Sequence, residues 1–358
     1  NNGYKLKNYR DKKGKLRSRP QNEQYYFKKG FSWSTISSSH ASFRFSPENF
    51  LFETKGSTIF PKKDIEFYNI GGFLNSKIVN KLLLVLSPTL DYHEGPMGKL
   101  PYIHEVSVEN IVKYCIDTSK NEWDSKETSW DYNQNELIKH KSQDLEECYD
   151  LYQQYWKNKF FQLHRNEEEL NRHFIDIYAL QDELTPDVPL KDITILKEET
   201  DIVNGELVFD AKEVMTQFMS YAVGCMFGRY SLDKEGLILA NQGETLEDYL
   251  TKVDKSEDTT SFLPDDDNII PILDDEWFED DIVGRFYEFL KVSFGVANFE
   301  KNLAFVEECL GKNIRKFFVK DFYADHVKRY KRRPIYWIFS SPKSSFSVLI
   351  YMHRYTPD

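Results

Sequence analysis

Apolar and polar residues alternate along residues 24–70, and this alternation predicts a series of short β-strands. The strand candidates are YYFKKGFSWSTISSS, ASFRFS and FLFETKGSTIFP, which are separated by turns rich in Gly, Ser and Pro. The next segment, FLNSKIVNKLLLVLSP, predicts a helix, because Asn75 or Ser76 can cap its start and Pro88 follows its end. The first part of the chain therefore combines a small sheet with helices.

Residues 144–180 carry the strongest helical pattern of the chain. Large apolar side chains recur there at helical spacing: Leu145, Tyr149, Tyr152, Trp156, Phe160 and Leu163. Asn166 and Glu169 match a capping box, so we expect a second helix to begin at Asn166. The segment TPDVPL at 185–190 then predicts a linker into another domain.

Helical patterns dominate residues 191–358, and the chain closes on a predicted β-hairpin. That hairpin pairs RRPIYWIFSS with SSFSVLIYMHRY, and we expect Arg332, Arg333 and Arg354 at its rims. Gly224 and Gly228 lie four apart in an apolar helix, a spacing that allows close packing. The patterns together predict an α+β protein with three parts: a β-sheet domain at 1–143, a helical spacer at 144–190, and an α-rich C-terminal domain at 191–358 that ends in the hairpin.

Composition excludes some classes of protein. Of the 358 residues 40% are hydrophobic, which is enough for real cores, yet no run of about 18 apolar residues exists to span a membrane. The first residues are polar and basic, with neither Met nor an apolar signal core, so we expect a piece of a longer protein. The four cysteines form no C-x-x-C pair, which argues against structural zinc and predicts a cytoplasmic location.

Charge is distributed unevenly along the chain. The formal net charge is −11, but residues 1–30 hold ten Lys/Arg against two Asp/Glu, a balance of +8. Residues 261–281 hold nine Asp/Glu and no Lys or Arg. This asymmetry indicates that only one end of the chain meets a polyanion such as nucleic acid.

No known arrangement of catalytic residues is present in the sequence. There is no G-x-S-x-G motif, no glycine-rich phosphate loop and no cysteine in a catalytic context, and the eight histidines are dispersed. The acids between Asp265 and Glu276 leave two interpretations open: a metal or nuclease site, or a solvated acidic loop that leads into a helix. The absence of a neighbouring Lys favours the loop.

The basic N-terminal segment is the better candidate for a binding site. Five of its residues are interleaved with Gly and Ser, as in a loop that follows phosphates: Lys12, Lys13, Lys15, Arg17 and Arg19. Five phosphate contacts would give a log–log salt dependence of about −4 to −5. The alternative interpretation is a solvated, disordered terminus, and charge alone does not separate the two.

The β-rich segment that follows adds further candidate DNA contacts: Trp33, Ser34, Ser37, Ser38 and Arg44. Ser and Arg side chains suit base edges and phosphates. The pattern favours Trp33 as a core residue over a wedge between bases, and the serines also suit ordinary strand and turn positions.

Several longer motifs carry a resemblance to a known family. The stretches from GFSWSTISSSHASFRFSPENF to GGFLNSKIVNKLLLVLSPTLDYHEGPMGKLPYI resemble target-recognition domains of type I specificity subunits and type IIG restriction–modification enzymes. MSYAVGCMFGRYSLD, PDDDNIIPILDDEWFEDDIV and KDFYADHVKRYKRRPIYWIFSSPKSSFSVLIYMHRY are similar to the C-terminal half of PglX-like adenine-specific DNA methyltransferases of BREX phage-defence systems. The resemblance covers nearly the whole chain.

The resemblance implies a mixed β-sheet in a DNA target-recognition domain, followed by a helical spacer and a scaffold. It also implies that the parent protein transfers a methyl group from S-adenosylmethionine to adenine in double-stranded DNA, after flipping the base. The N-P-P-Y motif and the donor-binding glycine loop of that family are missing here, so no residue is assigned to catalysis, cofactor or metal. The partners implied are double-stranded DNA and the methyltransferase lobe of the parent chain. An alternative is a protein-interaction scaffold that docks other BREX subunits or a DNA-mimic phage inhibitor.

Overall fold

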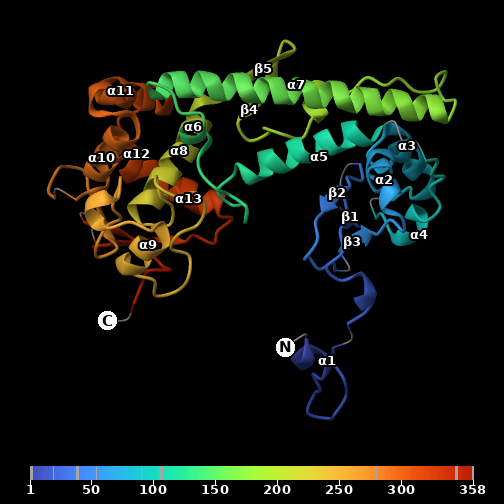
Figure 1. The fold of residues 1–358 in the computed structure, drawn as a ribbon, viewed down its shortest axis with the longest axis horizontal. Coiled ribbons are helices and arrows are strands. Elements are labelled where there is room, and N and C mark those ends of the chain that lie inside the picture. The colour runs from blue at the N-terminus through green and yellow to red at the C-terminus, as the bar shows by residue number, and fades with distance from the viewer. Residues whose placement is uncertain are drawn as a thin grey trace. The chain divides into compact units, whose positions relative to one another are not determined.

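The structure is a computed structural model that describes residues 3–18, 20–37, 40–53, 55–89, 91–104, 108–278, 280–342 and 346–356. The chain forms two compact units (Figure 1). Unit 1 comprises Asn1–Asp117 and Gln162–Pro189, and unit 2 comprises Thr118–Phe161 and Leu190–Asp358. Both units combine helices with small antiparallel sheets, which confirms the predicted α+β class.

Unit 1 is built around a three-stranded sheet in the order β2-β1-β3. The strands are β1 (Gly30–Ser34), β2 (Arg44–Ser46) and β3 (Gly56–Ile59). Both pairings of β1 are antiparallel, so the sheet is antiparallel where a mixed sheet was expected. The alternation in the sequence directs Phe31 and Trp33 of β1 into the core, where they are 1% and 4% exposed.

Unit 1 also contains short helices. They are α1 (Tyr4–Lys7), η1 (Glu23–Tyr25), η2 (Asp64–Glu66), α2 (Phe67–Leu74), α3 (Lys77–Leu86) and α4 (Glu94–Met97). Of these, α1 lies away from the sheet and has no buried residue (Figure 1). The predicted helix boundary at Ser76 is present, but its side chain does not cap α3. The Asn171 side-chain oxygen accepts the Lys77 backbone N–H instead, at 2.9 Å. A residue distant in sequence therefore satisfies the start of α3.

Two long helices have residues in both units, α5 (Glu109–Asp124) and α7 (Leu145–Ile177). The predicted apolar stripe of α7 is buried, as Trp156 and Leu163 show with 2% and 1% exposure. The expected helix start at Asn166 is wrong, because α7 runs through it without a break over 33 residues. Asn166 is buried within the helix, where its side-chain oxygen accepts a hydrogen bond from Gln162 at 2.8 Å.

Unit 2 is rich in helices, as predicted. Its elements before the last sheet are α6 (Glu136–Lys139), η4 (Leu190–Asp192), the strands β4 (Thr200–Val203) and β5 (Glu206–Phe209), α8 (Ala211–Met226), α9 (Leu246–Val253) and η5 (Glu257–Thr259). The later helices are α10 (Ile282–Phe294), η6 (Val296–Asn298), α11 (Phe299–Leu310), α12 (Ile314–Phe317), the π-helical η7 (Phe318–Phe322) and α13 (Tyr323–Arg329). The apolar helix α8 is almost entirely buried at the centre of the unit.

The predicted C-terminal hairpin is present as β7 (Tyr336–Ser340) and β8 (Ser347–Tyr351). A third strand, β6 (Ile269–Ile272), extends it to a sheet in the order β6-β8-β7. Arg354 does not lie at a rim as expected. It is 7% exposed, and its guanidinium donates to the backbone oxygens of Asp265 and Asp266.

Gly224 of α8 serves close packing inside unit 2, whereas Gly228 lies beyond the end of α8 with φ +72°, so the two glycines do not share one helix as expected. A Cβ atom on Gly224 would lie 2.4 Å from a ring carbon of Tyr230, so only glycine leaves room for that ring. Among the described residues no helix is long and apolar enough to cross a membrane.

Candidate nucleic-acid interface

The basic N-terminal segment folds into a small hairpin, which we call the basic hairpin and define as residues 9–17. Arg10 and Leu16 form an antiparallel bridge, and the Arg17 backbone N–H donates to the Tyr9 oxygen at 2.9 Å. Gly14 stands in the turn with φ +79°, a conformation that favours glycine. The sequence interleaved with Gly therefore forms an ordered turn.

Asp11 organises the basic hairpin. One oxygen of its carboxylate accepts the backbone N–H groups of Lys13 at 2.9 Å and Lys15 at 3.0 Å. The other oxygen accepts the Arg17 Nε–H at 2.8 Å. A short acid that hydrogen-bonds its own turn is a common way to stabilise such loops.

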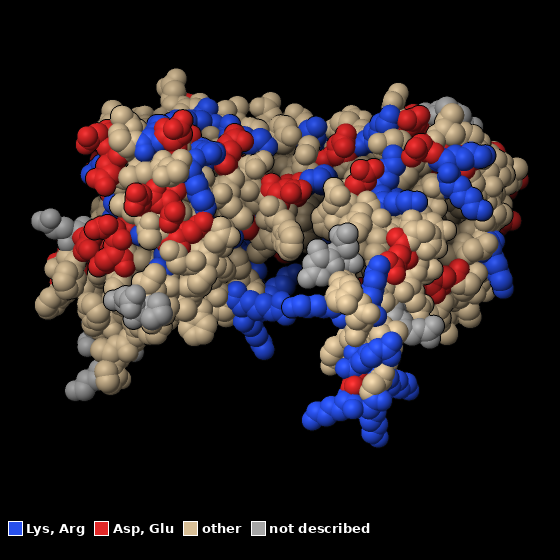
Figure 2. Space-filling view, turned by 60° about the horizontal axis from the view of Figure 1, so that its bottom comes forward, with Lys and Arg blue, Asp and Glu red and all other residues tan. Residues whose placement is uncertain are grey.

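This arrangement leaves three lysines directed to solvent. Lys12, Lys13 and Lys15 are exposed, and their ammonium groups form no ion pair with any described residue. Arg17 is also exposed but shares its charge with Asp11. Figure 2 shows the Lys and Arg side chains gathered on the N-terminal segment with few acids among them. Arg19 lies outside the described residues.

The second part of the candidate interface is the outer face of the β2-β1-β3 sheet. The register pairs Ser32 with both Arg44 and Thr58, and successive residues point to opposite faces. Polar side chains therefore line one face, opposite to the face that carries Phe31 and Trp33: Ser32, Ser34, Arg44, Ser46 and Thr58. Ser34 and Arg44 are exposed, and the others are partly exposed. The hydroxyl groups of the Ser and Thr residues and the guanidinium of Arg44 make this face polar and able to form hydrogen bonds.

The sheet brings only some of the predicted contacts together. Trp33 lies on the buried face, where its Nε1–H donates to the Tyr92 oxygen at 2.8 Å, so it is a core residue and we no longer propose it as a DNA contact. Ser37 donates to the His40 oxygen at 3.2 Å in the loop after β1. Ser38 lies outside the described residues. Ser34 and Arg44 remain on the outer face.

One feature of unit 1 was missed by sequence reasoning. A hollow of about 330 Å³ lies beside the start of β1, and its lining includes Phe27, Lys28, Lys29, Phe60 and Phe67. The available signal was the interleaving of aromatic and basic residues in YYFKKGF, which resembles a nucleic-acid-binding pattern as much as a strand.

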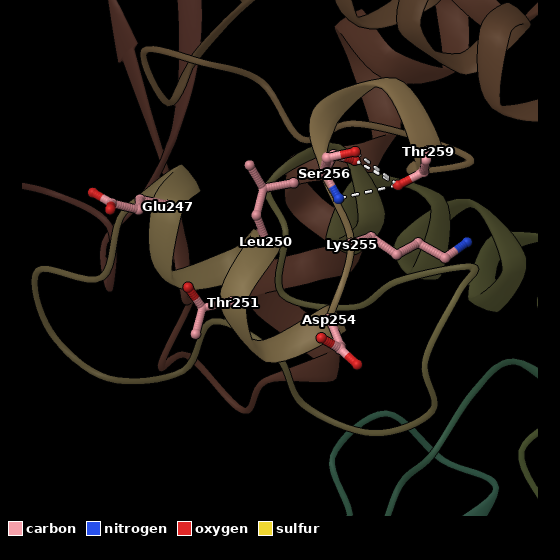
Figure 3. Close-up of a pocket in the computed structure, with 7 residues that line it drawn as sticks. All are labelled: Glu247, Leu250, Thr251, Asp254, Lys255, Ser256 and Thr259. Carbon is pink, nitrogen blue, oxygen red and sulfur yellow. Dashed lines mark hydrogen bonds between the residues drawn. The ribbon is translucent and has the colours of Figure 1, made fainter.

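Unit 2 also has a hollow, of about 540 Å³, beside α9 (Figure 3). Its charged side chains Glu247, Asp254 and Lys255 point in different directions, and Lys255 is paired with Asp233 outside the group drawn. The residues that line it include no histidine or cysteine. The side chains that line this hollow therefore form neither a catalytic arrangement nor a cluster of like charges that could bind an ion.

The acidic segment of unit 2 is structural where it is buried. Oxygens of Asp265 and Asp267 both accept the backbone N–H of Ile269, at 3.0 and 2.8 Å. Asp281 caps α10 and pairs with Arg315 at 2.5 Å. Within the described ranges, no cluster of three or more His, Cys, Asp or Glu is placed to hold a metal ion. The metal-nuclease interpretation therefore gains no support.

No protein-family model matches the chain. It is 36% identical over 374 aligned residues to the adenine-specific methyltransferase PglX of Lacticaseibacillus casei (strain Zhang), an alignment that covers 99% of this chain and 29% of that protein. It is 33% identical over 355 residues to the adenine-specific methyltransferase BrxX of Escherichia coli O9:H4 (strain HS), covering 94% of this chain and 29% of that protein. The chain thus spans less than a third of the length of these curated relatives.

These two matches show that the chain is related to adenine-specific methyltransferases. More particularly, it is the homologue of a portion of the PglX-like type, which confirms the resemblance found in the sequence.

Proposed function

We propose that this chain is the DNA-recognition part of an adenine-specific, S-adenosylmethionine-dependent DNA methyltransferase in BREX-type phage defence. Unit 1 contacts the duplex, and unit 2 is a scaffold. The observation that carries the proposal is the basic hairpin, whose three unpaired lysines are held on an ordered turn. Its relationship to PglX and BrxX agrees with this role.

The division of work follows from the chemistry of the two surfaces. Lys12, Lys13 and Lys15 contact phosphates and fix the register of the protein on the duplex, without reading sequence. Arg44 on the outer sheet face can form two hydrogen bonds with one base, and Ser34 can serve as donor or acceptor. The methyl donor and the flipped adenine bind in the methyltransferase lobe of the parent chain, which works with this chain in the cytoplasm.

Charge reversal in the basic hairpin tests this proposal. The variant carries Lys12→Glu, Lys13→Glu and Lys15→Glu, and binding to a labelled duplex is measured by fluorescence polarisation at several salt concentrations. Loss of three phosphate contacts reduces the log–log salt slope by about 3, in addition to the loss of affinity at any one salt concentration. A matched control reverses Lys197, Lys316 and Lys320, exposed lysines of unit 2 without ion pairs among the described residues.

The control is expected to keep the salt slope of the wild type. Equal losses in both triple variants would show that binding follows only net charge, and would contradict a specific role for the basic hairpin. Sequence recognition is tested separately, by selecting bound duplexes from a randomised pool. Enrichment of one short motif, lost on Arg44→Ala, supports reading by the outer sheet face, whereas an unenriched pool contradicts it.

A second candidate function is supported by the sheet of unit 2. Trp337 and Phe339 on β7 are 46% and 50% exposed, and they share an outer face with Ile269 of β6, which is 40% exposed. A continuous apolar sheet face is typical of a protein-interaction surface. We therefore keep the docking of another defence subunit as an alternative role for unit 2. Such a subunit would tolerate charge reversal in the basic hairpin, whereas a DNA-mimic inhibitor would not.

A further inference from the structure

An aromatic hollow beside the start of β1 is unused by the proposed contacts. Its volume is about 330 Å³, and the rings of Phe27, Phe60 and Phe67 contribute to its lining. Phe60 stacks on Tyr25 with ring centroids 5.0 Å apart, and Phe52 packs on its edge at 5.3 Å. The aromatic wall therefore rests on further rings, which hold Phe60 in place.

Phe27 has an unusual backbone conformation at the edge of this hollow. Its φ is +63°, which a bulky residue adopts only when the surrounding structure imposes it. Two backbone hydrogen bonds impose it here: Phe27 N–H donates to the Phe50 oxygen at 3.2 Å, and Asn49 N–H donates to the Phe27 oxygen at 3.0 Å. The ring is nevertheless 55% exposed, so the strain is not compensated by burial of the ring. Such a combination points to a binding role.

Charged groups surround the aromatic wall. Lys28 is exposed next to Phe27 in sequence, and the Lys29 ammonium lies 4.9 Å from the centroid of the Phe67 ring and 3.2 Å from an Asp64 oxygen. Glu48 lines the same hollow and forms no ion pair with a described residue. The site thus offers a flat apolar wall, the ammonium groups of two lysines and the carboxylates of Glu48 and Asp64 within one small space, and of the two acids only Asp64 is paired with a lysine among the described residues.

We infer that this hollow binds a single unstacked nucleobase of the DNA strand that unit 1 contacts. The base stacks on Phe27, Lys28 binds the adjoining phosphate, and the Glu48 carboxylate accepts a hydrogen bond from an exocyclic amino group. Adenine and cytosine suit this carboxylate, whereas thymine carries no exocyclic amino group. The inference rests on the proposed function, because bound DNA presents the base. It adds a site for an extrahelical base on the recognition unit itself.

The test compares three labelled duplexes that differ at one position: fully paired, with one bulged adenine, and with an abasic residue in place of that adenine. The bulged base is already unpaired, so no base pair has to be broken before it binds. Its stacking on Phe27 therefore raises the affinity of the bulged duplex above that of the abasic duplex. The wild type is expected to bind the bulged duplex between about 5-fold and about 150-fold more tightly than the abasic one, as stacking of one base on an aromatic ring predicts. A bulged thymine is expected to gain less than a bulged adenine.

Three variants separate the effect of the Phe27 ring on binding from its effect on the stability of the fold. Phe27→Asn removes the ring but accepts a positive φ readily, so we expect an unchanged or higher melting temperature and no preference for the bulged duplex. Phe27→Tyr keeps an aromatic ring and is expected to keep the preference. Asn49→Gly relaxes the neighbouring residue at φ +72° without removing a ring, and is expected to behave as the wild type.

The outcomes separate this inference from the proposed function. If the wild type binds all three duplexes equally well, the nucleobase site is wrong while DNA recognition stands. If Phe27→Asn loses stability together with all binding, the ring is structural and the inference is wrong. If no duplex binds, the proposed function fails. A short single-stranded adenine oligonucleotide then tests the hollow by itself, and the absence of Phe27-dependent binding overturns the inference too.

Discussion

The two units use their charged residues in opposite ways. Unit 1 contains 20 Lys/Arg and 18 Asp/Glu, whereas unit 2 contains 27 and 40, so their formal charges are +2 and −13. Every buried Asp, Glu, His or Arg among the described residues belongs to unit 2: Glu136, Asp144, Glu199, Asp265, Asp281, His326 and Arg354. The core of unit 1 is apolar, and its described charges lie at or near the surface.

This difference indicates a division of roles. A buried ion pair is strongly destabilising when one partner is removed, so buried charges commit unit 2 to one internal arrangement. Exposed and unpaired lysines contribute little to the stability of unit 1 but remain available to a polyanion. We therefore expect mutations of charged residues to affect mainly stability in unit 2 and mainly binding in unit 1.

The largest predicted effect is Glu199→Ala in unit 2. Glu199 is 1% exposed and accepts hydrogen bonds from Tyr152 at 2.5 Å and Gln217 at 2.9 Å, and it pairs with Lys126 at 2.7 Å. Burial would lower the pKa of Lys126, but Glu199 and Glu122 raise it, so the ammonium stays charged. Without Glu199 this largely buried charge, whose side chain is 16% exposed, loses its main partner, and we expect the free energy of unfolding to fall by about 3–5 kcal/mol. Hydrogen exchange of the α8 amides measures it.

Two controls sharpen this comparison. Glu198→Ala removes an exposed neighbouring acid. We expect it to change the unfolding free energy obtained from hydrogen exchange of the α8 amides by less than about 0.5 kcal/mol. Glu94→Ala removes the carboxylate that accepts a hydrogen bond from the hydroxyl of buried Ser57 in unit 1. We expect the free energy of unfolding to fall by about 1–3 kcal/mol. If Glu94→Ala were as destabilising as Glu199→Ala, the contrast between the two units would be wrong.

A smaller effect, dependent on pH, is predicted for Asp265→Asn in unit 2. Burial, followed by the hydrogen bond and charge of Asp267, raises the pKa of Asp265 from 3.8 to about 6. The folded state therefore holds this proton more tightly than the unfolded state, and stability falls as pH rises from about 4 to about 6. The amide introduced by the substitution cannot ionise, but its oxygen can still accept the Ile269 N–H, so the variant avoids this loss.

Urea denaturation at several pH values provides the measurement. Asp265→Asn is expected to match the wild type below pH 4 and to be more stable above pH 6, by up to about 3 kcal/mol. Asp266→Asn, a change of an exposed acid in the same loop, is expected to follow the wild type at every pH. A stability difference for Asp265→Asn that stays constant from pH 4 to pH 8 would contradict a perturbed carboxyl group.

Local patterns predicted the elements whose side chains repeat regularly. The alternation of Phe31 and Trp33 with polar residues matches the two faces of β1, and the terminal hairpin pairs as expected. The prediction of a helix start at Asn166 failed because the capping motif was judged from local sequence alone. In the structure the side chain of Asn166 is hydrogen-bonded to Gln162 within one continuous helix. Long-range contacts, such as the Asn171 cap on α3, leave no local signal.

The candidate site, like the fold, was predictable from the sequence only in part. Clustering of Lys12, Lys13 and Lys15 is visible in the sequence, and the structure adds that Asp11, which lowers the net charge, organises their turn. For the hollow at Phe27 the sequence offered only the interleaving of aromatic and basic residues in YYFKKGF, because nothing in a sequence marks a phenylalanine that adopts a positive φ. That conformation depends on the Phe50 and Asn49 backbone, more than twenty residues away.

The smallest predicted effect distinguishes the shape of the basic hairpin from its charge. Asp11→Ala removes an acid and makes the segment more positive, so charge alone predicts tighter DNA binding. The same change removes the acceptor of the Lys13, Lys15 and Arg17 hydrogen bonds. We expect the loss of order to dominate, and affinity for duplex DNA to fall by a few-fold, about 1 kcal/mol, because a disordered loop must be ordered on binding. Glu109→Ala removes a partly exposed acid on α5 that pairs with Lys113, so it adds the same charge without touching the hairpin and is expected to leave affinity unchanged or slightly higher. If Asp11→Ala binds more tightly than the wild type, unit 1 attracts DNA by charge alone, and the ordered turn has no part in recognition.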